Sequence, residues 1–101
     1  MAKKNDKKNV QMTAADAWQA SVESCREQID FINAKIKEAT THHMMKVSIY
    51  FSEENEEEHR LFGDLYVRNC IYEYFSDNGY EVRIDSFQFQ TISIQWTKRL
   101  I

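Results

Sequence analysis

Hydrophobic side chains recur every three or four residues through the first third of the chain, which is the spacing of one face of an α-helix. Thr13 precedes this pattern as a helix N-cap, and Asp16 lies in the first turn, where a carboxylate opposes the helix dipole. We therefore predict a long amphipathic helix over residues 13–40, roughly 40 Å long at about 1.5 Å per residue. Its apolar positions follow the spacing of a coiled-coil seam made of Trp18, Val22, Cys25, Ile29, Ile32 and Ile36.

This seam has two interpretations. A helix that lies across a sheet would bury the six residues in the core of its own domain. A helix of this length can also extend past a small domain and pair with a second copy of the chain. On the second basis we predict a homodimer with the seam as its interface.

The rest of the chain changes between strand and helix patterns. Apolar and polar side chains alternate over residues 45–51, 80–85 and 91–96, as in strands. A second helical pattern covers residues 53–77, with Ser52 as its N-cap and Gly79 beyond its end. The order α-β-α-β-β predicts a single small α+β domain. We expect a three-stranded mixed sheet with the helices on one face, because a strand–helix–strand connection joins parallel strands.

The connection between the last two strands contains Phe87 and Phe89. These two residues are out of phase with the apolar positions of the flanking strands, and a change of phase indicates a loop or a bulge. Phenylalanines near a hairpin tip either fold back onto the core or present an apolar contact to a partner, and the sequence leaves both open. Together with Trp96 they are our candidate partner-binding residues.

Five glutamates crowd the start of the second helix, in the sequence SEENEEEHR at residues 52–60. Acidic residues in a first turn oppose the positive end of the helix dipole. Two would suffice for that purpose, so the excess at Glu56, Glu57 and Glu58 is a candidate surface for steering a basic partner. A decoy for nucleic acid is disfavoured, because acids packed into so few turns point around much of the helix.

Composition limits the architecture and the partners. The 101 residues suffice for one domain, and 43% hydrophobic content permits a packed core. The net charge of −3 divides into a basic start and an acidic remainder. We expect residues 1–11 to be a disordered basic tail and residues 12–101 to form the domain. An acidic body disfavours nucleic-acid binding, so an accessory factor that binds nucleic acid is the alternative, and it would use the tail lysines Lys3, Lys4, Lys7 and Lys8.

Residue patterns typical of catalysis are sparse in this chain. The sequence contains no phosphate-binding glycine loop and no GxSxG motif. Glu56 and His59 share a helical face, but a di-iron site needs a second such pair. We therefore predict a protein that is not an enzyme, with no catalytic residue, metal or cofactor. Cys25 and Cys70 fall at apolar positions and are expected as free thiols in a reducing compartment.

Location and origin follow from two further patterns. The longest apolar run is far shorter than the roughly 20 residues of a membrane helix, so we expect a cytoplasmic protein without a membrane partner. The Lys-Asn-rich start, the absence of proline and the sequences YFSDNGYEVRID and ISIQW resemble small accessory proteins of large bacteriophages. This resemblance implies a non-enzymatic protein-interaction module that binds and inhibits or modulates a host protein or protein complex. A virion or assembly component is a further alternative.

Overall fold

The structure, a computed structural model, describes residues 11–97. The four tail lysines Lys3, Lys4, Lys7 and Lys8 lie outside these residues, as does the predicted disorder of residues 1–10. The described part of the chain contains four helices and three strands and belongs to the α+β class, as predicted. In order they are α2 (Ala14–Ser24), α3 (Arg26–Thr41), β1 (Lys46–Tyr50), α4 (Glu56–Phe62), α5 (Leu65–Asp77), β2 (Glu81–Asp85) and β3 (Thr91–Gln95).

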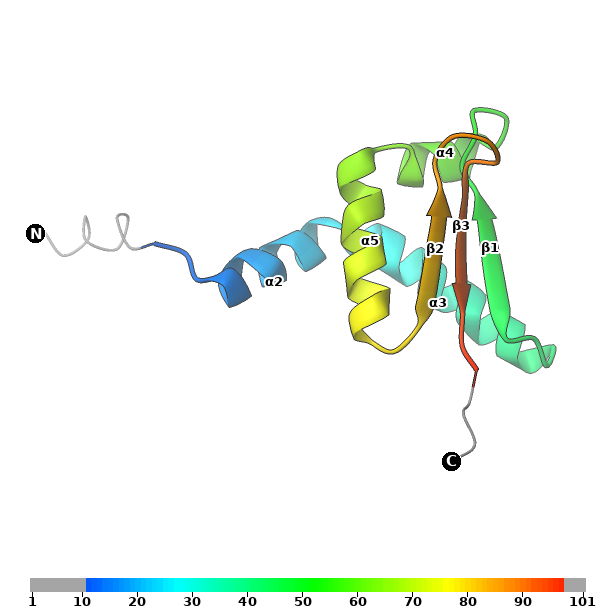
Figure 1. The fold of residues 1–101 in the computed structure, drawn as a ribbon, viewed down its shortest axis with the longest axis horizontal. Helices are drawn as coiled ribbons and strands as arrows, with labels where there is room; N and C mark the ends of the chain where they lie inside the picture. The colour runs from blue at the N-terminus through cyan, green and yellow to red at the C-terminus, as the bar shows by residue number, and fades with distance from the viewer. Residues whose placement is uncertain (1–10, 98–101) are drawn as a thin grey trace, which may run out of the picture.

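The sheet is antiparallel, which corrects the predicted mixed sheet. Among the described residues the strand order is β1-β3-β2, and β3 pairs antiparallel with both neighbours. Strands β1 and β2 do run in the same direction, but β3 lies between them (Figure 1). The strand–helix–strand connection therefore forms a split β-α-β unit, and the hairpin strand fills the gap.

Helices cover one face of the sheet. Val47 and Ile49 of β1 and Ile92 and Ile94 of β3 are buried, whereas the residues between them are exposed or half-buried. Helix α3 runs behind the sheet in Figure 1, and α5 contacts β2 from the same core. The other face carries the polar half of each strand's alternation, and no helix of residues 11–97 packs over it.

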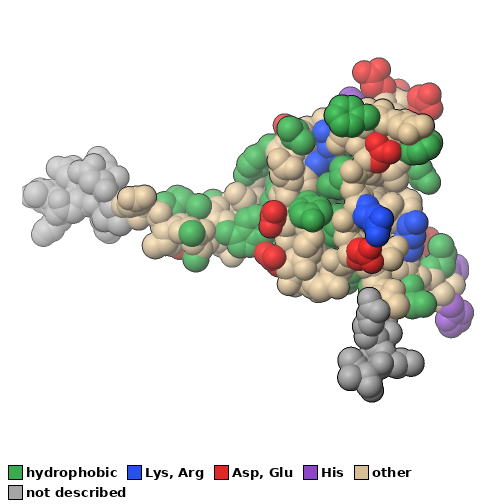
Figure 2. All heavy atoms as spheres, in the orientation of Figure 1, with side chains coloured by type: hydrophobic (Ala, Val, Ile, Leu, Met, Phe, Trp, Pro, Cys, Tyr) green, Lys and Arg blue, Asp and Glu red, His purple; other side chains and the backbone are tan. Residues whose placement is uncertain are grey.

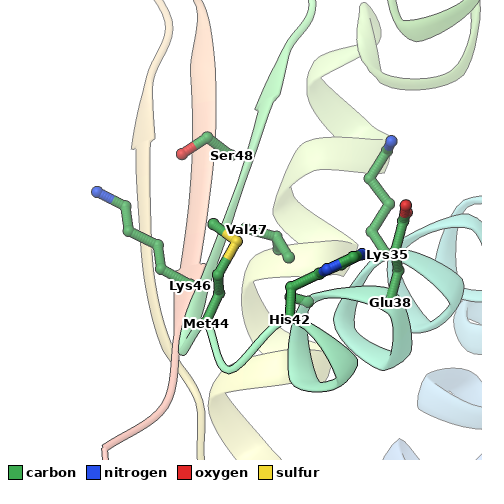
Figure 3. A pocket seen from close by; sticks show the side chains of 8 residues that line it. Lys35, Glu38, His42, Met44, Lys46, Val47 and Ser48 are labelled. Carbon is green, nitrogen blue, oxygen red and sulfur yellow. The ribbon is translucent and has the colours of Figure 1, made fainter.

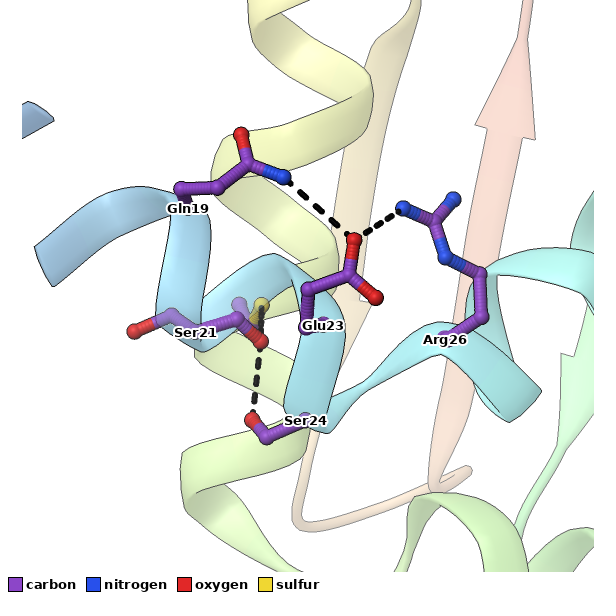
Figure 4. Close-up of polar contacts among 6 residues, drawn as sticks. Gln19, Ser21, Glu23, Ser24 and Arg26 are labelled. Atoms are coloured by element: carbon purple, nitrogen blue, oxygen red, sulfur yellow. Dashed lines mark hydrogen bonds and ion pairs between the residues drawn. The ribbon is translucent and has the colours of Figure 1, made fainter. Parts of the chain in front are cut away.

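The predicted long N-terminal helix is broken at Cys25, where φ is −113° and ψ is 21°. The hydroxyl of Ser24 donates to the carbonyl of Ser21 at 2.8 Å, a bond that competes with the helical backbone (Figure 4). The Glu23 carboxylate accepts a hydrogen bond from Gln19 within α2 at 3.3 Å and one from Arg26 across the break at 3.1 Å. As a result α3 turns onto the sheet while α2 projects from the body (Figure 1).

The break also changes the role of the predicted seam. The domain uses it as core, because the sheet needs an apolar helix face to cover it. A second copy could reach five of the six side chains only by opening the domain, so the seam as a whole is wrong as a dimer interface. Trp18 is half-buried on α2, and the buried residues are Val22, Cys25, Ile29, Ile32 and Ile36.

The second predicted helix is also two helices. Ser52 does not cap it; its carbonyl accepts from the N–H of Asn55 at 2.9 Å in a turn, and α4 begins only at Glu56. Glu56, Glu57 and Glu58 are therefore the first turn of α4, where they oppose the helix dipole, and the prediction that they are an excess beyond the first turn is wrong. Helix α4 ends at Phe62, and Gly63 is its C-cap. A side chain would not fit at Gly63, because its Cβ atom would lie 2.6 Å from the carbonyl oxygen of His59. Asp64 then caps α5 by accepting from the N–H of Tyr66 at 2.8 Å.

The predicted stop at Gly79 is confirmed. Its φ of 94° is left-handed, which suits glycine. The N–H of Gly79 bonds to Ser76 O at 3.1 Å, and the N–H of Tyr80 bonds to Phe75 O at 3.0 Å. The rings of Tyr80 and Phe75 also meet, with centroids 5.6 Å apart. These two hydrogen bonds and the apolar contact make a Schellman motif, which directs the chain into β2.

Candidate functional site

The connection between β2 and β3, residues 86–90, is here called the hairpin tip, and Asp85 organises it. One oxygen of the Asp85 carboxylate accepts the backbone N–H groups of Phe87 and Gln88, both at 3.0 Å. The other oxygen accepts the N–H of Phe89 at 3.4 Å. At the far side of the tip, the carbonyl of Gln90 accepts from the N–H of Phe51 at 2.9 Å. The tip is therefore anchored at both of its ends.

The two phenylalanines of the hairpin tip point into solvent. Phe87 is 95% exposed and Phe89 is 64% exposed. Of the two readings that the sequence left open, the structure therefore excludes the one in which these rings fold back onto the core. Two exposed rings on one anchored loop form an apolar patch, and such patches mark interaction sites.

Trp96, the third predicted contact residue, lies elsewhere. It follows the end of β3 that is remote from the hairpin tip, and its N–H donates to Met45 O at 3.0 Å. Its ring is half-buried and packs edge-on against Tyr80, with centroids 5.9 Å apart. Trp96 therefore belongs to the margin of the core and does not share a surface with Phe87 and Phe89.

The predicted acidic residues do emerge beside the hairpin tip. Strand β1 ends at Tyr50, directly opposite Thr91 where the tip ends, so the chain that follows β1 starts at the same end of the sheet. Figure 2 shows acidic and hydrophobic side chains gathered at this end of the visible face. Glu56 and Glu57 are exposed and Glu58 is half-buried. The neighbouring turn adds two exposed acids that we had not singled out, Glu53 and Glu54.

Part of this acidic charge is already paired. Arg60 donates to Glu57 at 3.3 Å and to Glu27 on α3 at 3.1 Å, and all three side chains are more than half exposed. Exposed pairs of this kind add little stability. The ring of His59 lies 2.9 Å from the carbonyl of Phe51 and so ties α4 to the end of β1. Arg60 offsets part of the charge at Glu57, but all five acids form a negative border beside the apolar tip: Glu53, Glu54, Glu56, Glu57 and Glu58.

The open face of the sheet adjoins the hairpin tip. Its cross-strand rows are Tyr50–Thr91–Asp85, Ser48–Ser93–Arg83 and Lys46–Gln95–Glu81. Small side chains in the middle leave a depression of about 370 Å³ that reaches Phe89. The Arg83 guanidinium is paired with Glu81 at 2.8 Å, which offsets its charge. Tyr50, 54% exposed, extends the aromatic surface of the tip onto this face.

The reactive groups of interest in the described residues are metal-ligating side chains and thiols. No group of three His, Cys, Asp or Glu side chains within residues 11–97 lies close enough to hold a metal ion. Both Cys25 and Cys70 are buried free thiols. Burial, together with a hydrogen bond to the Cys25 side chain, raises the pKa of Cys70 to about 12, so this thiol stays protonated at neutral pH.

No helix in the described part of the chain is long and apolar enough to cross a membrane.

Two residues of the site were missed from the sequence. Asp85 stands at the start of the loop, and an Asp in that place commonly accepts backbone N–H groups two or three residues further on, so it could have been found. Strand alternation placed Tyr50 on the open face of the sheet, but its position beside the hairpin tip depends on the pairing of β1 with β3, which the sequence did not predict. Comparison with known proteins finds no matching family model, no matching curated protein and no matching solved structure.

Proposed function

We propose that the protein is a non-enzymatic interaction module whose hairpin tip docks into an apolar cleft of a partner protein. The observation that carries this proposal is the exposure of Phe87 and Phe89 on a loop whose backbone is anchored by Asp85. The partner contributes the cleft, and the two rings are the anchors that fill it.

Energetics support a docking role for these rings. Burying one phenylalanine side chain contributes roughly 1.5–3 kcal/mol, so two rings contribute several kcal/mol to binding. Binding is also opposed by the entropy of ordering a loop. Because Asp85 already fixes the backbone of the tip, that entropic cost is reduced before the partner arrives.

The charge beside the tip suggests the character of the partner. The acidic border formed by Glu53, Glu54, Glu56, Glu57 and Glu58 suits a cleft with a basic rim, and it would accelerate the encounter with such a partner. The resemblance to bacteriophage accessory proteins supports a bacterial host protein or complex as the partner, which the bound tip would inhibit or modulate. A protein partner is favoured over nucleic acid because the same end of the molecule is acidic.

The test compares partner capture by matched variants. Phe87→Ala/Phe89→Ala is prepared beside Tyr72→Ala, which removes a ring that is 44% exposed on α5. Each tagged protein is incubated with bacterial lysate, and captured proteins are identified by mass spectrometry. The double variant should lose a partner that the wild type and Tyr72→Ala both retain, with a melting temperature close to that of wild type, because exposed side chains contribute little to folding. Retention of the partner by the double variant would refute the proposal.

A further inference from the structure

The outer edge of β1 carries backbone groups that bond to no other strand of the described chain. The N–H of Trp96 donates to Met45 O at 3.0 Å, and the N–H of Phe51 donates to Gln90 O at 2.9 Å. Hydrogen-bonded pairs alternate along an antiparallel ladder, so the odd-numbered residues of β1 bond to β3. The N–H and C=O groups of the even-numbered residues, Lys46, Ser48 and Tyr50, therefore point away from the sheet.

Apart from Lys46, this edge has few of the usual protections against pairing. Strand β1 contains no proline, glycine or bulge. Within residues 11–97, no backbone hydrogen bond from a loop or helix reaches Lys46, Ser48 or Tyr50. Figure 3 views the strand beside α3, with a groove of about 400 Å³ between them. An open, regular edge of this kind is a template for another strand.

We propose that the strand that pairs with this edge is β1 of a second copy of the chain, in an antiparallel arrangement about a twofold axis at Ser48. Ser48 then lies opposite Ser48 of the partner subunit, and Lys46 lies opposite Tyr50 of the partner subunit. All three cross-axis pairs are of the hydrogen-bonded type, because the groups that point outward belong to the same residues. The two sheets become one continuous sheet.

The side chains of β1 are complementary to themselves in this register. Lys46 and Tyr50 are both exposed on the open face, and the twofold axis sets each ammonium group against a tyrosine ring, a cation–π contact. The two Lys46 side chains lie at opposite ends of the paired strands. The chain's own β1 therefore supplies an aromatic partner for each Lys46 and keeps the two like charges apart. This favours a second copy over an unrelated strand.

The groove beside the edge is complementary to itself as well. It is lined by apolar side chains such as Ala39 and Met44, and Met44 is 55% exposed. Lys35 and Glu38 of α3 also line it (Figure 3). The twofold axis that crosses the strands at Ser48 brings the two grooves side by side, so the proposal places residues of opposite charge, Lys35 and Glu38, on both sides of the junction. The pairing uses neither Phe87 nor Phe89, but it shares Tyr50 with the surface beside the hairpin tip.

The test is a charge swap that only this register can rescue. Tyr50→Lys places a lysine opposite Lys46 in both symmetric pairs and should weaken the dimer about tenfold. Lys46→Glu/Tyr50→Lys restores opposite charges in the same two pairs and should restore the dimer. Tyr72→Lys makes the same change at an exposed tyrosine of α5, away from the edge, and should leave the dimer unchanged. Mass is measured by sedimentation and light scattering over a wide concentration range, with circular dichroism to verify folding.

Three outcomes would overturn the proposal: a wild type that is monomeric throughout, equal dimerisation of Tyr50→Lys and Tyr72→Lys, or a double variant as weak as Tyr50→Lys. A second measurement keeps the proposal testable if Tyr50→Lys does not fold. Opposite residues in a hydrogen-bonded pair have Cα atoms about 5.5 Å apart, within the range of a disulfide. Ser48→Cys should therefore form a covalent dimer under mild oxidation, and Tyr72→Cys should not. Equal cross-linking of both would contradict the register.

Discussion

Replacing Asp85 with alanine removes the acceptor that anchors the hairpin tip. Asp85 accepts two backbone N–H groups at 3.0 Å and a third at 3.4 Å, and its side chain is half-buried. A hydrogen bond to a charged acceptor contributes about 1.5–3 kcal/mol when it is well shielded. Solvent replaces part of that energy here, so we assign about 1 kcal/mol to each of the two short bonds and little to the third.

Asp85→Ala should therefore lower the free energy of unfolding by about 2 kcal/mol, which corresponds to about 10 °C in melting temperature for a domain of this size. Asp85→Asn is the matched control, because its remaining carbonyl oxygen can still accept the N–H groups of Phe87 and Gln88. Asp85→Asn should lower the free energy of unfolding by less than half as much as Asp85→Ala. Urea and thermal denaturation followed by circular dichroism measure both variants.

Two results would refute this reasoning. An Asp85→Ala variant as stable as the wild type would mean that the tip is not held by these bonds. An Asp85→Asn variant as unstable as Asp85→Ala would mean that the charge, rather than the geometry of the acceptor, matters. Under the proposed function, Asp85→Ala should also weaken partner capture while both phenylalanines remain present, because the loop must then be ordered at the moment of binding.

Two further predictions concern the acidic border and the buried thiols. Lysine substitution at Glu56, Glu57 and Glu58 should slow association with the captured partner at low salt and change dissociation little, as measured by surface plasmon resonance; an unchanged association rate would remove the steering role. The raised pKa of Cys70, about 12 against the ordinary 9.0, makes the unfolded thiol ionise before the folded one. The stability due to this thiol is thus fully present below pH 9 and is lost as the pH rises from 9 towards 12. Urea denaturation below and above pH 9 should show a shallower alkaline loss in Cys70→Ala than in wild type, and equal losses would contradict the assignment.

The parts of the fold that depend on local patterns were predicted from the sequence. Strand alternation placed all three strands within a residue or two, and Gly79 marked the end of α5. The strand order was not predictable in this way, because β3 inserts between β1 and β2 through pairings that are remote in sequence. The helix break at Cys25 was hidden as well, since the apolar spacing continues through it while the Ser24 hydroxyl bonds to the backbone.

The candidate site was predicted in part, for related reasons. The phase change correctly placed Phe87 and Phe89 in a loop, but whether they were exposed depended on the anchoring bonds of Asp85. Trp96 fitted the apolar alternation equally well as a contact or as core. Its packing against Tyr80 at the opposite end of the sheet decided between the two. The seam residues of the first helix posed the same choice, and the need to cover the sheet placed most of them in the core.

Site-specific photo-cross-linking tests the central claim, that the hairpin tip is the partner-binding surface, most directly. A benzophenone amino acid replaces Phe87 in one protein and Tyr72 in a matched control, both are expressed in bacteria, and the cells are irradiated. The account predicts a discrete covalent adduct with one partner protein from position 87 and none from position 72. An absence of adduct at position 87, or the same adduct from both positions, would contradict it.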